Sequence, residues 1–399
     1  MTVFDDAEKN WQLALDVLRP SQKDLEHGLE LHRNSFVFDS YGFMPTGGGK
    51  CERADRLIRE HASRSEIKYA IENFRQTGSM DDPETRRRLK EAWEFAGVDC
   101  VFQNCGEESN DIEILIRRLS SFINVTDKLD GFYERAAYPE QLEKIRERGN
   151  RSLYITANGV PLANRMISAE ETLMYIEMFF NFGVRMMHFT YNRRNLLGDG
   201  CFETADAGLS DLGKMAIKEM NRVGVIPDIA HSGQRTSLEA ALCSEKPVVA
   251  SHAVAGKLSD HCRSKCDEVI EAVKRTNGYI GICAIPAFLQ GSMMIDSFID
   301  HIDYVARTFG VDHVAIGTDN PMQLGAVETE EKAQPSRPGF EQYKGSKKYA
   351  VSTQMQYNCM SWSNWPLFTV GLVQRGYSDK DIQKIIGGNV LRVCRETLA

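Results

Sequence analysis

The chain has 399 residues, of which 42% are hydrophobic and 26% are charged, and its formal net charge is −8. This composition is that of a globular protein large enough to bury a substantial core. Because the charge is acidic and no long Lys/Arg run interrupts it, we expect neither a nucleic acid nor a membrane as partner. No stretch of about 18 apolar residues predicts a membrane span. Ten cysteines scattered without a disulfide framework favour reduced thiols in a cytoplasmic protein.

The first 34 residues predict a helical extension that precedes the main domain, which we expect to cover residues 35–399. In that domain, short apolar runs alternate with amphipathic stretches such as 170–182, 211–223 and 298–309. Strands that alternate with helices indicate an α/β protein with a parallel sheet. Eight such strands predict a closed TIM-type (β/α)8 barrel. The eight runs are 35–39, 97–102, 152–156, 184–190, 225–230, 247–251, 278–283 and 313–317.

Two segments depart from this alternation. Residues 44–50 (MPTGGGK) form a glycine-rich loop after the first strand, but they lack the spacing of a phosphate-binding loop, GxxxxGKS or GxxxxGKT. Residues 320–365 follow the last strand and are long, polar and rich in Gln, Lys and Pro. We interpret this insertion as a lid over the barrel mouth or as a subunit contact.

Reactive groups in such barrels lie directly after the carboxyl ends of the strands. Three residues at these positions stand out, since His231, His252 and Asp319 each follow a different strand. A single histidine there more often bonds a neighbouring carbonyl, but two imidazoles and a carboxylate together match the ligand types of a zinc-like divalent ion. The residues at the strand ends are Tyr41, Gln103, Asn104, Cys105, Asn158, Tyr191, His231, His252, Cys283 and Asp319.

Around these residues the sequence resembles the renal or membrane dipeptidase family, whose members are zinc dipeptidases of the amidohydrolase superfamily with a (β/α)8 barrel. GLSDLGKMAIKEMNRVGVIPDIAHSG resembles that family's helix–strand–histidine segment, and KPVVASHAVAGKLSDHCRSKCDEVI resembles the segment with its second histidine and a substrate-binding arginine. VDHVAIGTDN resembles its final-strand aspartate segment, and RGYSDKDIQKIIGGNVLRVCRETL its closing helices. The resemblance runs from about Ser35 to the C-terminus and is weakest in the 320–365 insertion.

The resemblance fails at part of the expected metal site. The family's HxD pair falls on Tyr41 and Phe43, its bridging glutamate falls on Asn158, and a histidine that contacts substrate falls on Tyr191. Phenylalanine cannot ligate a metal, neutral tyrosine is a poor ligand, and an amide has no charge with which to bridge two cations. We therefore expect the second metal to be absent and one divalent metal, zinc by the resemblance, to be possible.

Four residues match the family's remaining machinery. The resemblance implies that His231 and His252 are metal ligands, that Asp319 is the catalytic acid–base, and that Arg263 binds a substrate carboxylate. A ligand role for Asp319 also stays open. Tyr41, Asn158 and Tyr191 are candidates for substrate contacts. Asn158, Tyr191 or a thiol of Cys105 or Cys283 would add contacts at the metal site, or these are ordinary wall residues.

Three functions agree with these residues. The first is a dipeptidase-like hydrolase of a small amide or dipeptide with a single or absent metal. The second is a barrel repurposed for a lyase, isomerase or tailoring reaction on a small molecule that carries a carboxylate. The third is a non-catalytic homologue, which loss of the metal positions favours and retention of four site residues disfavours. In each case the resemblance implies a homodimer.

Overall fold

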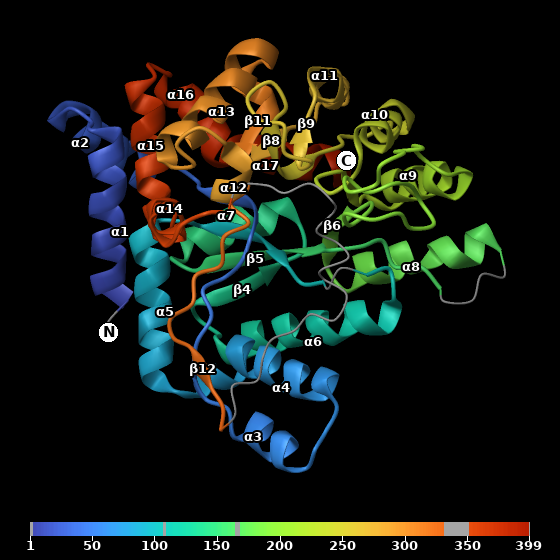
Figure 1. Ribbon diagram of the computed structural model, residues 1–399, viewed down its shortest axis with the longest axis horizontal. Helices are drawn as coiled ribbons and strands as arrows, with labels where there is room; N and C mark the ends of the chain where they lie inside the picture. Colours follow the sequence, from blue (N-terminus) through green and yellow to red (C-terminus); the bar gives the residue numbers. More distant parts are fainter. Residues whose placement is uncertain (1–2, 107–108, 164–167, 331–350, 399) are drawn as a thin grey trace.

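The computed structural model describes residues 3–106, 109–163, 168–330 and 351–398. Its centre is a set of eight strands, one for each run that the sequence predicts (Figure 1). These strands are β1 (Phe38–Gly42), β3 (Cys100–Asn104), β5 (Arg151–Ala157), β6 (Val184–His188), β7 (Ile226–Asp228), β8 (Ala250–Ala255), β10 (Ile280–Ile282) and β11 (Val314–Ile316).

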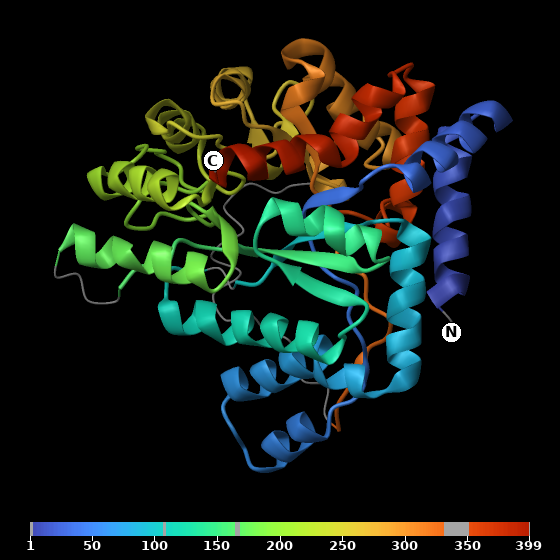
Figure 2. The same ribbon diagram turned by 180° about the vertical axis from the view of Figure 1, so that it is seen from behind.

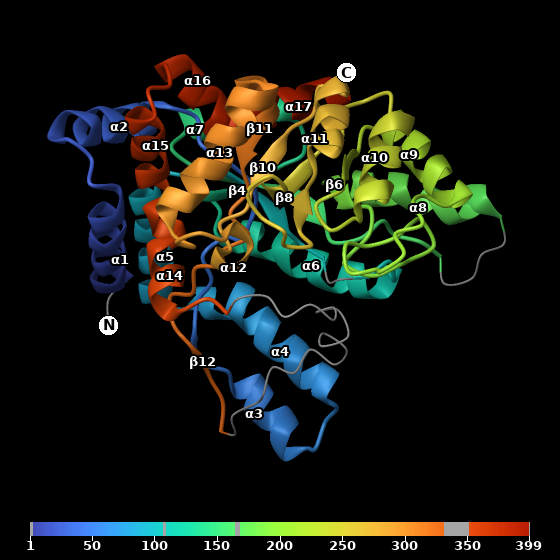
Figure 3. The same cartoon turned by 45° about the horizontal axis from the view of Figure 1, so that its top comes forward.

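The strands pair in parallel and close on themselves. One sheet has the order β1-β3-β5-β6-β7, and the other runs β11-β10-β8. Between β7 and β8, Asp228 forms a parallel bridge with Val249. Between β11 and β1, the amide of Asp319 donates a hydrogen bond to the carbonyl of Tyr41 at 3.0 Å. Contacts on both sides therefore join the two sheets into the predicted TIM-type barrel (Figure 3).

Two of the remaining short strands pair with strands of this ring. β9 (Ser264–Lys265) pairs with β8, and β4 (Tyr133–Ala136) pairs with the first half of β5. The sequence analysis missed β4 because its four residues, YERA, include a partly exposed glutamate and an exposed arginine. They therefore lack the apolar run that marks a fully buried strand.

Helices cover the outside of the barrel (Figure 2). α9 shows how the sequence sets their ends: the Ser210 hydroxyl accepts a hydrogen bond from the Gly213 amide, and the helix stops at Gly224, where φ is +94°. The predicted helices at 170–182 and 211–223 are present, and the third begins at Ile295 rather than at 298. The outer helices are α5 (Pro83–Ala96), α6 (Ile112–Lys128), α7 (Pro139–Glu147), α8 (Ala169–Asn181), α9 (Asp211–Val223), α10 (Gln234–Cys243), α11 (Asp267–Arg275), α13 (Ile295–Phe309), α16 (Asp379–Gln383) and α17 (Asn389–Leu398).

The N-terminal segment is helical, as expected. Its helices α1 (Val3–Leu18) and α2 (Gln22–Asn34) lie beside α15 (Trp365–Gln374) in both views (Figures 1 and 2). A domain boundary at residue 34 stays a prediction. None of the helices in the described part of the chain has the length and apolarity needed to cross a membrane.

The insertion after the last strand is only partly described, since residues 331–350 lie outside the described ranges. Its first part returns to the glycine-rich loop, where β12 (Val327–Glu328) pairs with β2 (Gly49–Lys50) beside α3 (Glu52–Arg59) and α4 (Arg64–Gln76) (Figure 1). Its last part contains α14 (Gln354–Cys359). The role of the insertion as a lid or subunit contact stays a prediction.

The barrel interior changes from apolar to polar toward the mouth. A buried cluster fills the lower interior, with Phe38, Phe102, Tyr154, Met186, Ile226, Val249, Tyr279 and Ala315. Because residues two apart on a strand face the same side, the residues two positions further along form the next interior level. The residues of that level are small or polar. That level contains Ser40, Asn104, Thr156, His188, Asp228, Ser251, Gly281 and Gly317. One imidazole, that of His188, and one carboxylate, that of Asp228, therefore lie directly beneath the mouth.

Candidate metal centre and active site

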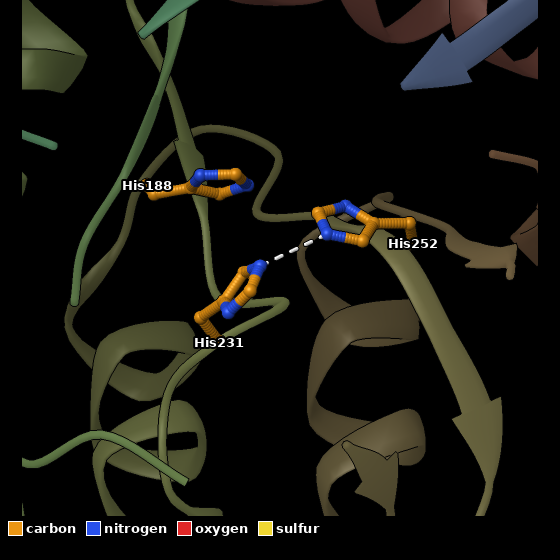
Figure 4. Close-up of side chains that lie close together, drawn as sticks. All are labelled: His188, His231 and His252. Carbon is orange, nitrogen blue, oxygen red and sulfur yellow. Dashed lines mark hydrogen bonds between the residues drawn. The ribbon is translucent and has the colours of Figure 1, made fainter. Parts of the chain in front are cut away.

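Two of the predicted ligands meet at the mouth. His231 follows β7 and His252 lies in β8, and their Nε2 atoms are 3.0 Å apart (Figure 4). Their exposed fractions are only 3% and 0%. The structure thus brings together two imidazoles that are 21 residues apart in the sequence.

Hydrogen bonds on the far side of each ring fix where the protons lie. Nδ1 of His231 is 2.6 Å from Oδ1 of Asn192, and an amide oxygen only accepts, so Nδ1 carries the proton. Nδ1 of His252 is 2.8 Å from Oγ of Ser251, whose own proton goes to the carboxylate of Asp228. Nδ1 of His252 therefore donates as well. Both Nε2 atoms consequently present lone pairs to each other, and a cation between them would relieve the repulsion.

The electrostatics keep both rings neutral. Burial lowers the pKa of His231 and of His252 well below 6.5, and the positive charge of Arg263 lowers both further. Neutral imidazole is the form that ligates metals. Two nitrogens bound to a tetrahedral zinc at about 2.05 Å lie roughly 3.3 Å apart, close to the spacing of this pair. The two residues therefore fit one divalent ion.

A third imidazole, which the sequence analysis missed, completes the cluster. His188 ends β6, and each of the three histidines offers a ring nitrogen within 4.8 Å of the others (Figure 4). Reactive side chains were expected only after the strands, and the family resemblance places a histidine that contacts substrate at Tyr191 instead. The available signal was the two-residue spacing from Met186, which places His188 on the interior face of its strand.

The residues at the family's other ligand positions bracket the imidazoles. Tyr41 stacks on His252, with ring centroids 3.8 Å apart, and Tyr191 stacks on His231 at 3.9 Å. The Tyr41 hydroxyl donates to Oδ1 of Asn158 at 2.8 Å, while Nδ2 of Asn158 is buried without a hydrogen-bond partner. Tyr41 and Tyr191 thus hold the planes of two imidazoles, and Asn158 has a donor available to a ligand.

Asp319 lies at the edge of this cluster. Its Oδ2 is 4.0 Å from Nε2 of His252, and its side chain keeps 22% exposure. Its φ of +51° is a left-handed conformation. Hydrogen bonds hold the backbone on both sides: Thr318 donates its amide and its hydroxyl to the buried carboxylate of Asp39, and the Asp319 amide donates to the carbonyl of Tyr41. Asp319 thus lies beside one imidazole of the cluster and is partly open to solvent, a position that is compatible with a proton acceptor and with a ligand.

Arg263 is buried beneath the segments that carry both histidines. Its Nε donates to the carbonyl of Ala230 at 3.2 Å, and its Nη2 donates to the carbonyl of His252 at 2.9 Å. Its guanidinium also lies 5.2 Å from the ring centroid of Phe288. These contacts fix the orientation of a positive charge near the cluster, with an exposed fraction of 4%.

The two thiols named from the sequence are poor ligands. Burial raises the pKa of Cys105 and of Cys283 above the ordinary thiol value, which keeps both protonated at neutral pH. Neither belongs to the histidine cluster of the described residues.

Comparisons with known proteins agree with this geometry. Dipeptidase tcpJ of Claviceps purpurea (strain 20.1) is 24% identical over 351 residues, which cover 84% of this chain and 74% of tcpJ. Dipeptidase verJ of Clonostachys rogersoniana is 28% identical over 219 residues, which cover 54% of this chain but only about half, 48%, of verJ. An amidohydrolase from Pseudomonas aeruginosa shares the fold, with a TM-score of 0.68 and 22% identity over 93% of this chain and 98% of its own. A family model described as membrane dipeptidase (peptidase family M19) matches residues 61–330, well over half of the sequence. The chain therefore belongs to the membrane dipeptidase family.

Proposed function

We propose that this protein hydrolyses a small amide, such as a dipeptide or a modified amino acid, with a metal site reduced to a single divalent ion. The opposed Nε2 lone pairs of His231 and His252, 3.0 Å apart, carry this proposal because a shared cation would stabilise them. Membership of the membrane dipeptidase family supports dipeptidase-like hydrolysis. Zinc suits a small set of neutral imidazoles with an open position for water.

The chemistry of the remaining positions supports one ion rather than two. By the resemblance, Tyr41, Phe43 and Asn158 stand where the family has a histidine, an aspartate and the bridging glutamate as first-site ligands. The Tyr41 hydroxyl is committed to Asn158, and neither residue carries a negative charge that would hold a second cation.

In the proposed reaction, different residues of the mouth serve different steps. When bound, the ion supplies the positive charge that polarises an amide carbonyl and acidifies a water molecule. Asp319 accepts the water proton as the new C–O bond forms, and returns it to the leaving amine as the C–N bond breaks. Arg263 binds the substrate carboxylate with the N–H groups that the carbonyls of Ala230 and His252 do not engage.

Hydrolysis can be tested on the full chain, stripped of metal and reloaded with zinc. We expect release of free amine from a panel of dipeptides and N-acyl amino acids of both configurations, and strong loss of that release in Asp319→Asn at unchanged metal content. Bound zinc without cleavage of any panel member would overturn hydrolysis in favour of another reaction. Absence of both zinc binding and cleavage would overturn it in favour of a non-catalytic homologue.

A further inference from the structure

We propose that His188 is the third protein ligand of a mononuclear three-histidine centre, which replaces the acidic ligands of the family's dinuclear site. This inference rests on the proposed function only in assuming that a divalent ion binds between His231 and His252. It assigns a metal-binding role to a residue within β6, whereas the family resemblance pointed to Tyr191, after that strand.

The surroundings of His188 leave its ring nitrogens without a hydrogen bond, and one of them contacts a carboxylate. The side chain is fully buried, and neither Nδ1 nor Nε2 makes a hydrogen bond of acceptable geometry. Nε2 lies 2.8 Å from Oδ2 of Asp228, so the two groups are close without being aligned for a hydrogen bond. A buried polar group without a hydrogen bond destabilises the folded state, and a cation bound to one ring nitrogen would satisfy that nitrogen.

The three rings have the spacing that one tetrahedral ion requires. Their centroids form a nearly equilateral triangle, with sides of 5.0 Å (His188–His231), 5.3 Å (His188–His252) and 5.0 Å (His231–His252). Three imidazoles bound to one zinc through nitrogen would have centroids roughly 5.2 Å apart. In Figure 4 the imidazole rings of His188, His231 and His252 surround a common point. One nitrogen of each ring lies within 4.8 Å of a nitrogen of the other two, and the His188 ring makes no hydrogen bond that ion binding would have to break.

The neighbouring strands supply an outer layer of partners for the centre. His188 and Asp228 are register partners on β6 and β7, and the bridge from Asp228 to Val249 continues the layer to β8. The Asp228 carboxylate accepts hydrogen bonds from the amides of Ala230 and Ser251 and from the Ser251 hydroxyl that orients His252. The Asp228 carboxylate thus orients His252 through Ser251, lies beside His188 and would offset part of the charge of the ion.

Cobalt(II) binding distinguishes a ligand from a buried histidine that merely neighbours Asp228. The full chain is stripped of metal and titrated with cobalt(II), with visible absorption, stoichiometry and metal-dependent thermal shift as readouts. We compare the wild type with His188→Gln, with His188→Cys, and with His301→Gln as a matched control. His301 is also buried, but its Nδ1 accepts from the Ala255 amide and its Nε2 contacts the Leu289 carbonyl.

We expect the wild type and His301→Gln to bind one equivalent of cobalt, and His188→Gln to bind it at least about 100-fold more weakly. In His188→Cys, a thiolate-to-cobalt charge-transfer band would show that the side chain at position 188 touches the ion. Wild-type affinity in His188→Gln would overturn the inference, as would cobalt binding without that band in His188→Cys. Because these readouts need no substrate, His188-dependent binding without peptide cleavage would refute the hydrolase alone. Cleavage by a metal-loaded His188→Gln of unchanged affinity would refute the ligand role alone.

Discussion

Histidines are buried in two regions of this molecule, and their ring nitrogens differ in how they are satisfied. In the outer helical layer, Nδ1 of His32 contacts the Thr369 hydroxyl and Nε2 contacts the Ala96 carbonyl, so both nitrogens have partners. At the barrel mouth, His231 and His252 direct lone pairs at each other, and His188 makes no hydrogen bond of acceptable geometry. Burial alone therefore does not distinguish a structural histidine from a candidate ligand, whereas the donors and acceptors around each ring do.

The largest expected effect separates the chemistry of the mouth from its metal binding. In Asp319→Asn we expect kcat to fall by about 10²–10⁴-fold, because an amide cannot accept the proton of the attacking water. Metal content should stay the same, since Asp319 lies outside the histidine cluster. Steady-state kinetics with metal analysis on the same sample checks both expectations. A parallel loss of metal would make Asp319 a ligand instead.

The next effect concerns the structural histidine of the comparison. Burial lowers the pKa of His32 to about 4, against the opposing influence of its hydrogen bond with Ala96. The folded state therefore favours the neutral ring, and this contribution to stability is present above pH 6.5 and is lost as the pH falls toward 4. The loss should reach about 3 kcal/mol. Urea unfolding at pH 7 and pH 4 should show a smaller acid destabilisation in His32→Gln, and equal losses in both proteins would contradict the assignment.

The next smaller effects come from the same substitution, histidine to glutamine, made once in each of the two regions. We expect His231→Gln to raise the zinc dissociation constant roughly 100-fold, because it removes one of few ligands. His301→Gln should leave that constant unchanged and reduce the free energy of unfolding by about 1–3 kcal/mol, because two buried backbone groups lose a well-placed partner. Competition with a chelating dye and urea unfolding measure the two quantities. The comparison fails if both variants weaken zinc binding alike.

The smallest expected effect tests the carboxylate pocket. In Arg263→Lys we expect KM to rise about tenfold for a dipeptide with a free carboxylate, because an ammonium group cannot form the paired hydrogen bonds of a guanidinium. KM for the same dipeptide with an amidated C-terminus should change little. An equal rise for both substrates would mean that Arg263 acts by holding the carbonyls of Ala230 and His252 rather than by binding substrate.

The sequence predicted the barrel because each of its eight strands is an apolar run bounded by polar residues. It did not predict β4, where Glu134 and Arg135 are at least partly exposed and interrupt the apolar pattern. The same local signal placed His231 and Asp319 after their strands, where the structure has them, but His252, which was expected after its strand, lies inside β8 because that strand continues to Ala255.

Other features of the site depend on contacts between distant parts of the chain. His188 ends the run VRMMH, whose two-residue spacing places it on the same face as Met186, but only closure of the barrel shows that this face points toward His231 and His252. The roles of Asn192 and Asp228 follow from hydrogen bonds between neighbouring strand segments. Asn192 bonds His231, 39 residues away, and Asp228 bonds Ser251, 23 residues away. Local sequence patterns contain no information on which atoms these side chains will meet.

The three histidines project from neighbouring strands, β6, the end of β7 and β8. Ion binding at this centre would therefore depend on a single arc of the barrel wall. Phe43 and Asn158, which lie after other strands, do not belong to this group of histidines. If the proposed function holds, substitutions at these two positions would alter the shape of the mouth without removing a ligand, so substrate preference and metal affinity could evolve separately.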